Sequence, residues 1–431
     1  MKAHSPAPNC RSREVFHTVR TALSVICATG AVVLPGPSMA QSSVGPQRAA
    51  APSLHDAVAT AWARLPERQN LAAQGASAAA RHAAGGAFFP NAPYATGAYF
   101  NDKVLGSNYN YLTTQAELGT PIWLPGQGRA TQATAQADGV AVQAAAEAVH
   151  LALAAQVLDL AVQGTLAANA RDVAARRLAT AQSLAANLAR QFRVGESAQS
   201  DALAASADAA NAAMTFSNAE AQLGAAQAAL QAVVGSTAVP RLDAPGPAPA
   251  AASDPAAAHP RIIAAARAIE AAQAAARLVL IENRDSPEVG LQGINEKQPG
   301  SKWDTRFGVT FRFPFATETR NAPRRAAAEQ AITQATVQLA MAQREVLSGI
   351  QQARAVLAGA ERSGAASVRA AAELERRRGQ IERAWRVGEM PLIEVVRANA
   401  LAYDAEYARD RARTDLAAAR LRLRLAEGTL P

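Results

Sequence analysis

The tetrapeptide Arg-Val-Gly-Glu occurs twice in the chain, at 193–196 and at 386–389, each time after an aromatic residue. The copies are 193 residues apart, and the same offset aligns other features. Pro121 in "GTPIWLPGQGRA" falls on Pro314 in "FRFPFATETRNA", and two Ala-rich segments entered through proline turns also coincide. Several matches at one offset indicate that most of the 431 residues form two copies of one unit.

The longest part of each unit is a segment of 66 residues with almost no proline, 127–192 in the first and 320–385 in the second. Pro323, the one exception, lies in the opening turn of its segment, where proline is tolerated. As a helix, each segment would extend about 99 Å at 1.5 Å per residue. Apolar residues recur at intervals of seven with four-residue slips, which predicts a coiled-coil-like seam.

Two strands are predicted before each long helix, at about 94–101 and 109–123 and at about 287–295 and 303–315. In "RFGVTFRF" apolar side chains alternate with Arg, Gly and Thr, which is typical of a transmembrane barrel strand and also of half a soluble sandwich. Four strands cannot close a barrel, because closed barrels begin at about eight strands. Open edges are not viable in lipid, so a barrel would be shared, and three chains would supply twelve strands.

The first 40 residues have the pattern of a secretory signal peptide. Basic residues precede a 14-residue apolar run, and Ser38-Met39-Ala40 fits a cleavage site. An uncleaved anchor is the alternative, although a spanning helix needs about 20 residues. Cys10 and Cys27 both lie in this segment, so the mature chain is expected to hold no disulfide or thiolate metal site.

The repeat also predicts the domain organisation. A Pro/Ala-rich segment separates the two copies and reads as a poorly structured linker. We expect a signal peptide at 1–40, a first repeat at 41–238 with its hairpin turn at about 193–197, a linker at 239–260, and a second repeat at 261–431 with its turn at about 386–390.

Charge and composition argue against nucleic-acid binding and against catalysis. The formal net charge is +8, about +5 without the signal region, and acids and bases alternate with no basic block. His55, His82, His150 and His259 are scattered without metal-ligand spacing, and no nucleophile motif or phosphate-binding loop is present. We therefore expect a protein that is not an enzyme and needs no cofactor and no metal.

With these features the chain resembles the TolC family of outer-membrane efflux channels. The resemblance covers essentially the whole mature chain and rests on the duplicated unit and on the turns "FRVGESAQSDALAA" and "WRVGEMPLIEVVRANALAYDAE". It implies a mainly α-helical protein with a membrane β-barrel, in which a trimer forms a 12-stranded barrel continued by a long periplasmic α-barrel. The passage "FGVTFRFPFATETRNAPRRAAAEQAI" looks like the heavy-metal, CzcC-like branch of the family.

The turn residues have a structural role and, by resemblance, a binding role. Gly195 and Gly388 can adopt the left-handed conformation that ends a helix. Arg193 and Arg386 suit a helix C-terminus, and Glu196 and Glu389 are expected to open the next helix. Pro391 is expected in the first turn of the second of these helices. In the family these tips meet a hairpin of the periplasmic adaptor. The resemblance thus makes adaptor-contact candidates of all eight residues, Arg193, Val194, Gly195, Glu196, Arg386, Val387, Gly388 and Glu389.

Beyond the tips lie residues that the resemblance assigns to the periplasmic aperture. Asp201 and Glu394 match acids that constrict this entrance in the family, and a ring of carboxylates would attract cations. Arg397 stands where members often have a second acid, and Trp385 where they often have a tyrosine. The alternative for each acid is a solvated helix surface.

The resemblance implies a passive export conduit in the outer membrane of a Gram-negative bacterium, with a large periplasmic part. Its partners would be two further copies of the chain, a periplasmic adaptor (membrane fusion) protein, an inner-membrane RND-type pump and outer-membrane lipid, with cation or heavy-metal cargo. Two alternatives are a multidrug or type I secretion channel and, of another class, a periplasmic adaptor-type coiled-coil protein.

Overall fold

A computed structural model describes residues 51–103, 105–106, 108–243 and 258–430, so the expected signal peptide and most of the expected linker lie outside the described residues. All described elements belong to one compact unit, Ala50–Pro431. In chain order the elements are α1 (Leu54–Arg64), α2 (Pro66–Gly85), β1 (Tyr94–Asn101), β2 (Leu112–Pro121), α3 (Gln127–Arg193), α4 (Gln199–Val234), α5 (Pro260–Ile281), β3 (Glu288–Lys297), β4 (Asp304–Arg312), α6 (Glu318–Arg386) and α7 (Leu392–Ala426).

The element boundaries follow the 193-residue offset. α3 and α6 end at Arg193 and Arg386, and α4 and α7 begin at Gln199 and Leu392, so both pairs of boundaries are 193 positions apart. The two long helices and the four strands are confirmed, with ends within a few residues of those predicted. The offset would place a counterpart of α1 at 247–257, which lies outside the described residues.

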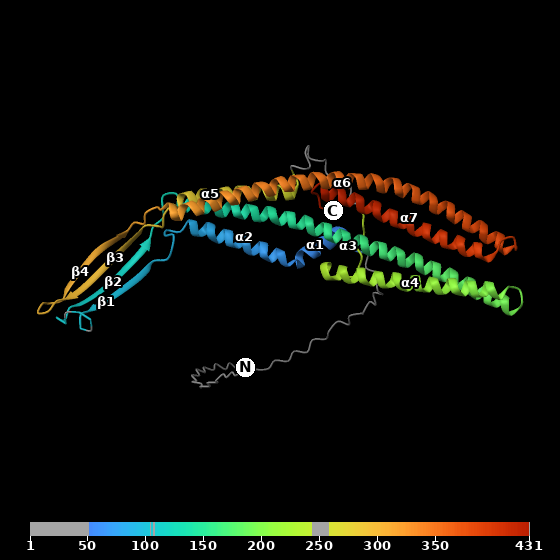
Figure 1. Cartoon of the computed structure of the whole chain (residues 1–431), viewed down its shortest axis with the longest axis horizontal. Coiled ribbons are helices and arrows are strands. Elements are labelled where there is room, and N and C mark those ends of the chain that lie inside the picture. Colours follow the sequence, from blue (N-terminus) through green and yellow to red (C-terminus); the bar gives the residue numbers. More distant parts are fainter. Residues whose placement is uncertain (1–50, 104, 107, 244–257, 431) are drawn as a thin grey trace, which may run out of the picture. The chain divides into compact units, whose positions relative to one another are not determined.

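The four strands form one antiparallel sheet in the order β1-β2-β3-β4. β2 pairs with β3, so the two repeats meet at the middle of the sheet. The sheet lies beyond the N-terminal ends of α3 and α6, and the two Arg-Val-Gly-Glu turns lie at their C-terminal ends (Figure 1).

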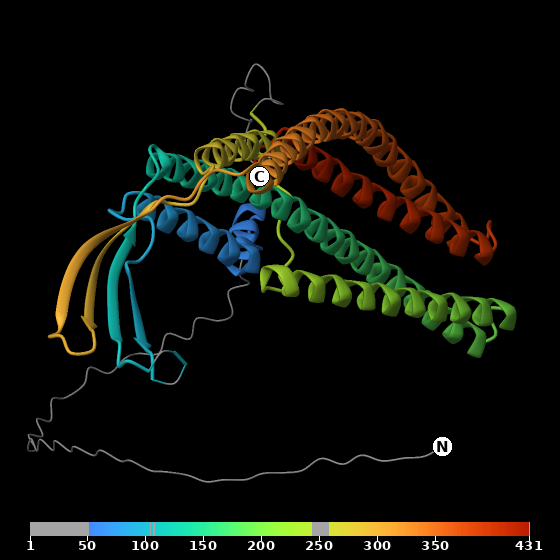
Figure 2. The same ribbon diagram turned by 60° about the vertical axis from the view of Figure 1, so that its left-hand side comes forward.

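α3 is the central helix of the unit. Near the sheet it packs against α2 and α5, and α5 in turn packs against α6. Towards the turns it packs against α4, its hairpin partner, and against α7 from the other repeat (Figure 2). The four hairpin helices therefore lie in the order α4-α3-α7-α6, and α4 and α6 are the two outer helices.

The α3–α4 hairpin has a seam of small side chains. Ala205, Ala212 and Ala219 of α4 are buried at intervals of seven, and Ala174 and Ala181 of α3 are buried at the same interval. Residues spaced by seven lie on one face of a coiled coil, as the sequence predicted. Alanine at these positions lets two helix backbones lie close together over several turns.

The largest apolar core lies near the middle of α3. Leu158 of α3, Leu230 of α4 and Leu421 of α7 are fully buried there, together with residues of α1. The core therefore joins the end of the first hairpin to the end of the second and fixes both against the central helix.

Candidate functional site

The first turn is held by backbone hydrogen bonds. Gly195 has a φ of +81°, in the left-handed region. Its N–H donates to the carbonyl of Phe192 at 3.1 Å, and the N–H of Glu196 donates to the carbonyl of Gln191 at 2.8 Å. These two bonds define a Schellman motif, which satisfies carbonyls that the end of α3 would otherwise leave without partners.

The second turn repeats this geometry. Gly388 has a φ of +82° and donates to the carbonyl of Trp385 at 2.9 Å, while Glu389 donates to the carbonyl of Ala384 at 2.9 Å. The tetrapeptide therefore forms the same C-terminal capping motif at the ends of both long helices.

The side chains of both turns point away from the rest of the described chain. Val194 and Val387 are each 70% exposed. A Cβ placed on Gly195 or on Gly388 would meet no described atom within 4 Å. The tips therefore hold their shape through the backbone, and their side chains are available to a partner.

Two details of the predicted turns were wrong. Glu196 and Glu389 do not open the next helices, because α4 begins only at Gln199 and α7 at Leu392. After each left-handed glycine, three more residues lie outside any helix before the next helix begins. Each glutamate therefore contributes to the turn through its backbone N–H. Pro391, expected in the first turn of α7, is instead its N-cap residue.

The arginines lie where they were predicted. Arg193 and Arg386 are the last residues of α3 and α6, where a positive charge interacts favourably with the helix dipole. Arg386 also pairs with Glu382, one turn earlier in α6.

The aperture candidates differ among themselves. Arg397 donates to Glu394 at 2.6 Å within α7, so the positive charge lies directly on the acid that was expected to attract cations. Asp201 lies in the first turn of α4, and its side chain has no hydrogen bond or ion pair within the described part of the chain, so none joins it to the Trp385 indole.

Trp385 is a half-buried packing residue. Beside Leu188 of α3, Ala205 of α4 and Leu392 of α7 it contributes to one apolar cluster, and beside Ile381 it contributes to a second. The first cluster thus has members on all four hairpin helices, so it links the two hairpins close to their turns.

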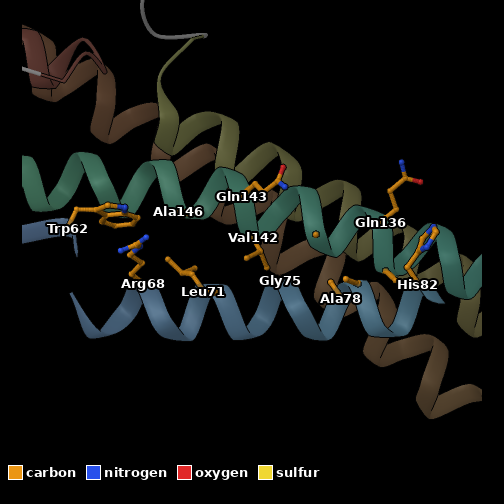
Figure 3. A pocket seen from close by; sticks show the side chains of 14 residues that line it. Trp62, Arg68, Leu71, Gly75, Ala78, His82, Gln136, Val142, Gln143 and Ala146 are labelled. Atoms are coloured by element: carbon orange, nitrogen blue, oxygen red, sulfur yellow. The ribbon is translucent and has the colours of Figure 1, made fainter. Parts of the chain in front are cut away.

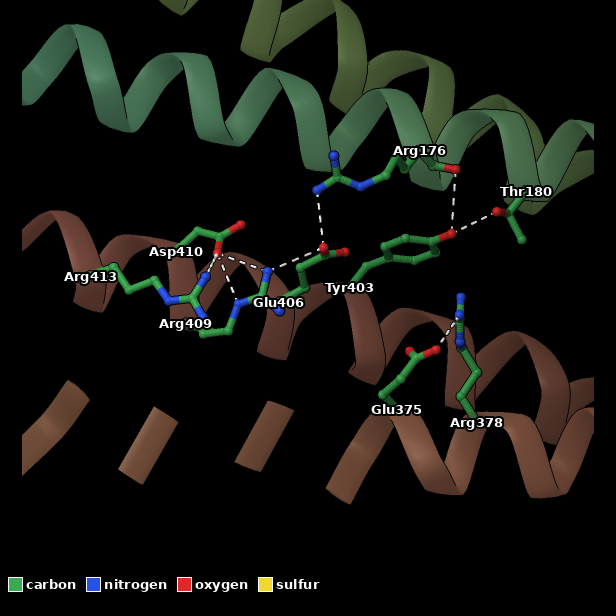
Figure 4. Close-up of polar contacts among 9 residues, drawn as sticks. All are labelled: Arg176, Thr180, Glu375, Arg378, Tyr403, Glu406, Arg409, Asp410 and Arg413. Carbon is green, nitrogen blue, oxygen red and sulfur yellow. Dashed lines mark hydrogen bonds and ion pairs between the residues drawn. The ribbon is translucent and has the colours of Figure 1, made fainter. Parts of the chain in front are cut away.

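A polar connection between α3 and α7 was not found from the sequence (Figure 4). The hydroxyls of Thr180 and of the buried Tyr403 share a hydrogen bond at 2.6 Å, and the Tyr403 hydroxyl also donates to the carbonyl of Arg176 at 3.4 Å. The Arg176 side chain pairs with Glu406 at 3.1 Å, and the guanidinium of Arg378 lies over the Tyr403 ring at 5.6 Å. The only sequence signal was a tyrosine in an Ala-rich helix, which also fits ordinary packing.

The sheet has one apolar and one polar face. Pairing sets Leu118, Leu291 and Val309 in one row across three strands, and Phe307 and Phe311 lie on the same face. These five side chains are 55–88% exposed. An exposed apolar face of this size needs an apolar environment, and strands that alternate in this way are typical of membrane barrels.

The polar face carries two contacts that cross a strand. Tyr94 of β1 donates to Glu288 of β3 at 2.9 Å over Gly119, and Thr310 of β4 donates to Glu117 of β2 at 2.6 Å over Gly290. A Cβ on Gly119 would come within 2.5 Å of the Tyr94 ring, and one on Gly290 within 2.7 Å of the Glu117 carboxylate. These glycines make room for the side chains that line this face.

A groove of about 610 Å³ lies between α2 and α3 (Figure 3). Its walls are mostly small and apolar, with Gly75, Ala78 and Val142, and its rim holds His82 and Gln143. No group of three or more His, Cys, Asp or Glu side chains gathers around a common point in the part of the chain that the structure describes. α3 contains one stretch apolar enough to cross a membrane by length and composition, a test that the core helix of a soluble protein also passes.

Comparison with solved structures identifies the class of fold: it is that of the TolC-type outer-membrane channels. The CmeC outer membrane channel of Campylobacter jejuni is similar with a TM-score of 0.70 and 14% identity, over 87% of this chain and 85% of that one. For CusC, described in connection with transmembrane channel formation, the TM-score is 0.69 at 17% identity, over 87% and 92% of the chains. The MtrE outer membrane channel of Neisseria gonorrhoeae gives 0.68 at 18%, over 88% and 89%.

Sequence comparison adds no closer relative, since neither a protein-family model nor a curated protein matches the chain. At identities of 14–18% the structural likeness concerns the fold.

Proposed function

We propose that the protein is the outer-membrane channel of a tripartite efflux system in a Gram-negative bacterium. It would act as a passive conduit from the periplasm to the outside, with no chemistry of its own. The observation that carries the proposal is the sheet, which has an exposed apolar face on one side and a mainly polar face on the other. Such a sheet separates lipid from water.

The conduit would be a homotrimer. One copy supplies four strands, and β1 and β4 leave two unpaired edges that lipid does not tolerate. Three copies joined edge to edge would close twelve strands, with the polar face inside. Purified from the outer membrane in detergent, the protein should have the mass of three chains and should form conducting pores in planar bilayers. A monomer without conductance would contradict the proposal.

The tips would bind the periplasmic adaptor. Val194 and Val387 support this role because they are exposed apolar side chains on turns that do not need them for their shape. We expect the double variant Val194→Asp, Val387→Asp to assemble as a trimer but to lose export. The matched control, Val194→Thr with Val387→Thr, keeps the shape of both side chains and should retain export. Equal export by both variants would contradict the assignment.

The pump would be of the RND type, and the cargo cations or heavy metals, as the likeness to the CzcC-like branch suggests. Asp201 supports an anionic entrance, whereas the pair of Glu394 and Arg397 weakens it. Deleting the gene should raise sensitivity to zinc, cobalt, cadmium and copper more than sensitivity to dyes and antibiotics. Unchanged metal sensitivity would instead favour a multidrug or type I secretion channel.

A further inference from the structure

The lysines of the chain are confined to one end of the sheet. After residue 40 the chain has three lysines, Lys103, Lys297 and Lys302, and every other strongly basic residue is an arginine. Lys297 ends β3, and the other two lie in the connections β1–β2 and β3–β4. Both connections lie at the end of the sheet away from the helices, because α2, α3, α5 and α6 all join the strands at the opposite end (Figure 1).

Lys297 lies at the outer end of the apolar face. It follows Leu291 by six positions in β3, and side chains an even number of positions apart share one face of a strand. Trp303, directly before β4, lies on the same face, since the Lys297 ammonium group is 5.8 Å from the centre of its ring. Tyr99 of β1 lies one row closer to the helices on this face. Outward along the face, apolar side chains are therefore followed by Tyr99 and then by Trp303 with Lys297.

This order of side chains matches the layers of a lipid leaflet. Apolar side chains suit the hydrocarbon, and tryptophan and tyrosine rings are enriched at the interface with water. A lysine keeps its carbon chain in apolar surroundings while its ammonium group extends to the headgroups. With the apolar face in lipid, the ammonium group of Lys297 would lie at the level of the headgroups.

The other cations of the strands are neutralised on the polar face. Arg306 pairs with Glu296 and, at 3.1 Å, with Asp304, and Arg312 pairs with Glu288 at 3.5 Å. The acids at the outer end of β3 and β4 are thus already bound by an arginine on the face opposite to Lys297.

The three lysines have no such partner. In the described part of the chain, no hydrogen bond or ion pair involves the ammonium group of Lys103, Lys297 or Lys302. The carboxylate of Asp102, next to Lys103, accepts two backbone N–H groups of its own loop at 2.7 and 2.9 Å. Lys103 and Lys302 are exposed, as is Lys297 beside the Trp303 ring. This end of the sheet therefore presents positive charges that the chain itself does not compensate.

We propose that these three lysines bind the phosphate groups of the outer-leaflet lipid, a phosphorylated glycolipid (lipopolysaccharide). The inference rests on the channel proposed above, which turns this end of the sheet towards the outside, and it names the lipid that the rim of the barrel recognises. Lysine binds phosphate as a point charge. Phosphate monoesters carry close to two negative charges, so they attract these ammonium groups more strongly than the phosphodiester of an ordinary phospholipid.

Amine labelling tests the contact directly, because no other side chain after residue 40 carries an amine. The full-length protein is placed in nanodiscs of phosphatidylcholine with or without diphosphoryl lipid A and is treated with a water-soluble amine-reactive ester. Mass spectrometry should show several-fold less labelling of Lys103, Lys297 and Lys302 with lipid A. High salt should restore the labelling, because it screens exposed charges. Phosphatidylglycerol with the same number of phosphate groups should protect the lysines less.

Charge-removing and charge-keeping variants give a second readout. The triple variant Lys103→Gln, Lys297→Gln, Lys302→Gln should retain several-fold less lipid A in native mass spectrometry than the unmodified protein. The matched control, with arginine at the same three positions, keeps the charge and should retain the lipid. Both variants should keep the mass of three chains and the conductance, because the changes lie in the outer connections and on the apolar face.

Equal retention of lipid A by the glutamine and arginine variants would overturn the inference. Equal protection by phosphatidylglycerol would also overturn it, since any anionic surface would then suffice. A conducting trimer whose lysines are labelled equally with and without lipid A would contradict the lipid site while leaving the proposed channel intact. A protein that neither forms trimers nor conducts would contradict both.

Discussion

The two helical hairpins end in the same turn but have different surfaces. The two turns have the same geometry, with glycine φ values of +81° and +82° and the same two backbone hydrogen bonds. Their return helices differ strongly: α4 has three acids and no Lys or Arg, whereas α7 has seven arginines and five acids. One backbone design therefore supports two kinds of helix surface.

This difference shows which residues specify the hairpin and which specify its neighbours. Seam and turn are shared, because the backbone geometry needs them in both repeats. The charges are not shared, because α7 packs against α3 of the other repeat, whereas its counterpart α4 does not pack against α6 among the described residues. Duplication has thus kept the fold and changed the contacts.

The largest effect is expected at the turn glycines, where the two hairpins should respond alike. Val at position 195 or 388 would have to adopt a left-handed φ, which costs about 1–3 kcal/mol for a residue other than glycine. Gly195→Val and Gly388→Val should therefore lower the melting temperature by similar amounts. Asn tolerates this conformation, so Gly195→Asn and Gly388→Asn are the controls. Loss of stability in only one hairpin would show that the turns are not equivalent.

A second effect is expected at the alanine seam. Ala205, Ala212 and Ala219 of α4 correspond to Ala398, Ala405 and Ala412 of α7 at the 193-residue offset, but Ala405 is only half-buried. Ala212 is fully buried between α4 and α3. Ala212→Leu would overfill this contact at a cost of about 1–3 kcal/mol. Ala207→Leu, on the exposed side of α4, is the control and should leave the unfolding transition unchanged. If both variants were equally stable, close packing of the alanine seam would be wrong.

A smaller effect is expected where the second hairpin meets α3. Tyr403→Phe keeps the ring but removes the hydroxyl that joins Thr180 to the carbonyl of Arg176. The loss of one buried hydrogen bond costs about 1 kcal/mol. A double-mutant cycle with Thr180→Val in chemical unfolding measures the coupling, and additive effects would show that the two hydroxyls do not interact.

The smallest effect is a pH dependence at the junction of α5 and α7. His259 is 3% exposed and caps α5 by accepting the N–H of Arg261 on Nδ1 at 3.1 Å. Burial lowers the pKa of His259, and the charge of Arg261 lowers it further. The unfolded chain therefore binds the proton more readily, so stability should fall as the pH drops below about 6.5. His259→Asn can still cap the helix and should flatten the pH profile of the melting temperature between 5 and 7; an unchanged profile would assign the titration to another group.

Most of the fold could be predicted because its signals are periodic. The long helices follow from a near absence of proline and from heptads, and Leu153, Leu230, Val346 and Ile350 of those heptads are buried. The strands follow from alternation, whereas the pairing of β2 with β3 across the two repeats was not predicted. Boundaries at the turns were less predictable, since five residues, 194–198 and 387–391, lie outside any helix before the next helix begins.

The candidate site was only partly predictable. Gly195 and Gly388 were found because a left-handed residue after a long helix is almost always glycine. Trp385 was placed at the aperture by resemblance, which stays a prediction, and its packing in one cluster with Leu188, Ala205 and Leu392 was not predicted. Contacts between side chains far apart in sequence, such as Thr180 with Tyr403, leave no periodic trace.

The Schellman turns have a consequence for how such a protein can change. Backbone hydrogen bonds close each turn, and no described atom lies within 4 Å of a Cβ placed on either glycine. The shape of the turns therefore does not depend on the side chains of Val194 and Val387. Substitutions of these valines should leave the stability of the fold unchanged and should affect only the binding of a partner at the tip. A lineage could therefore exchange one binding partner for another by point mutation, while every intermediate sequence still folds.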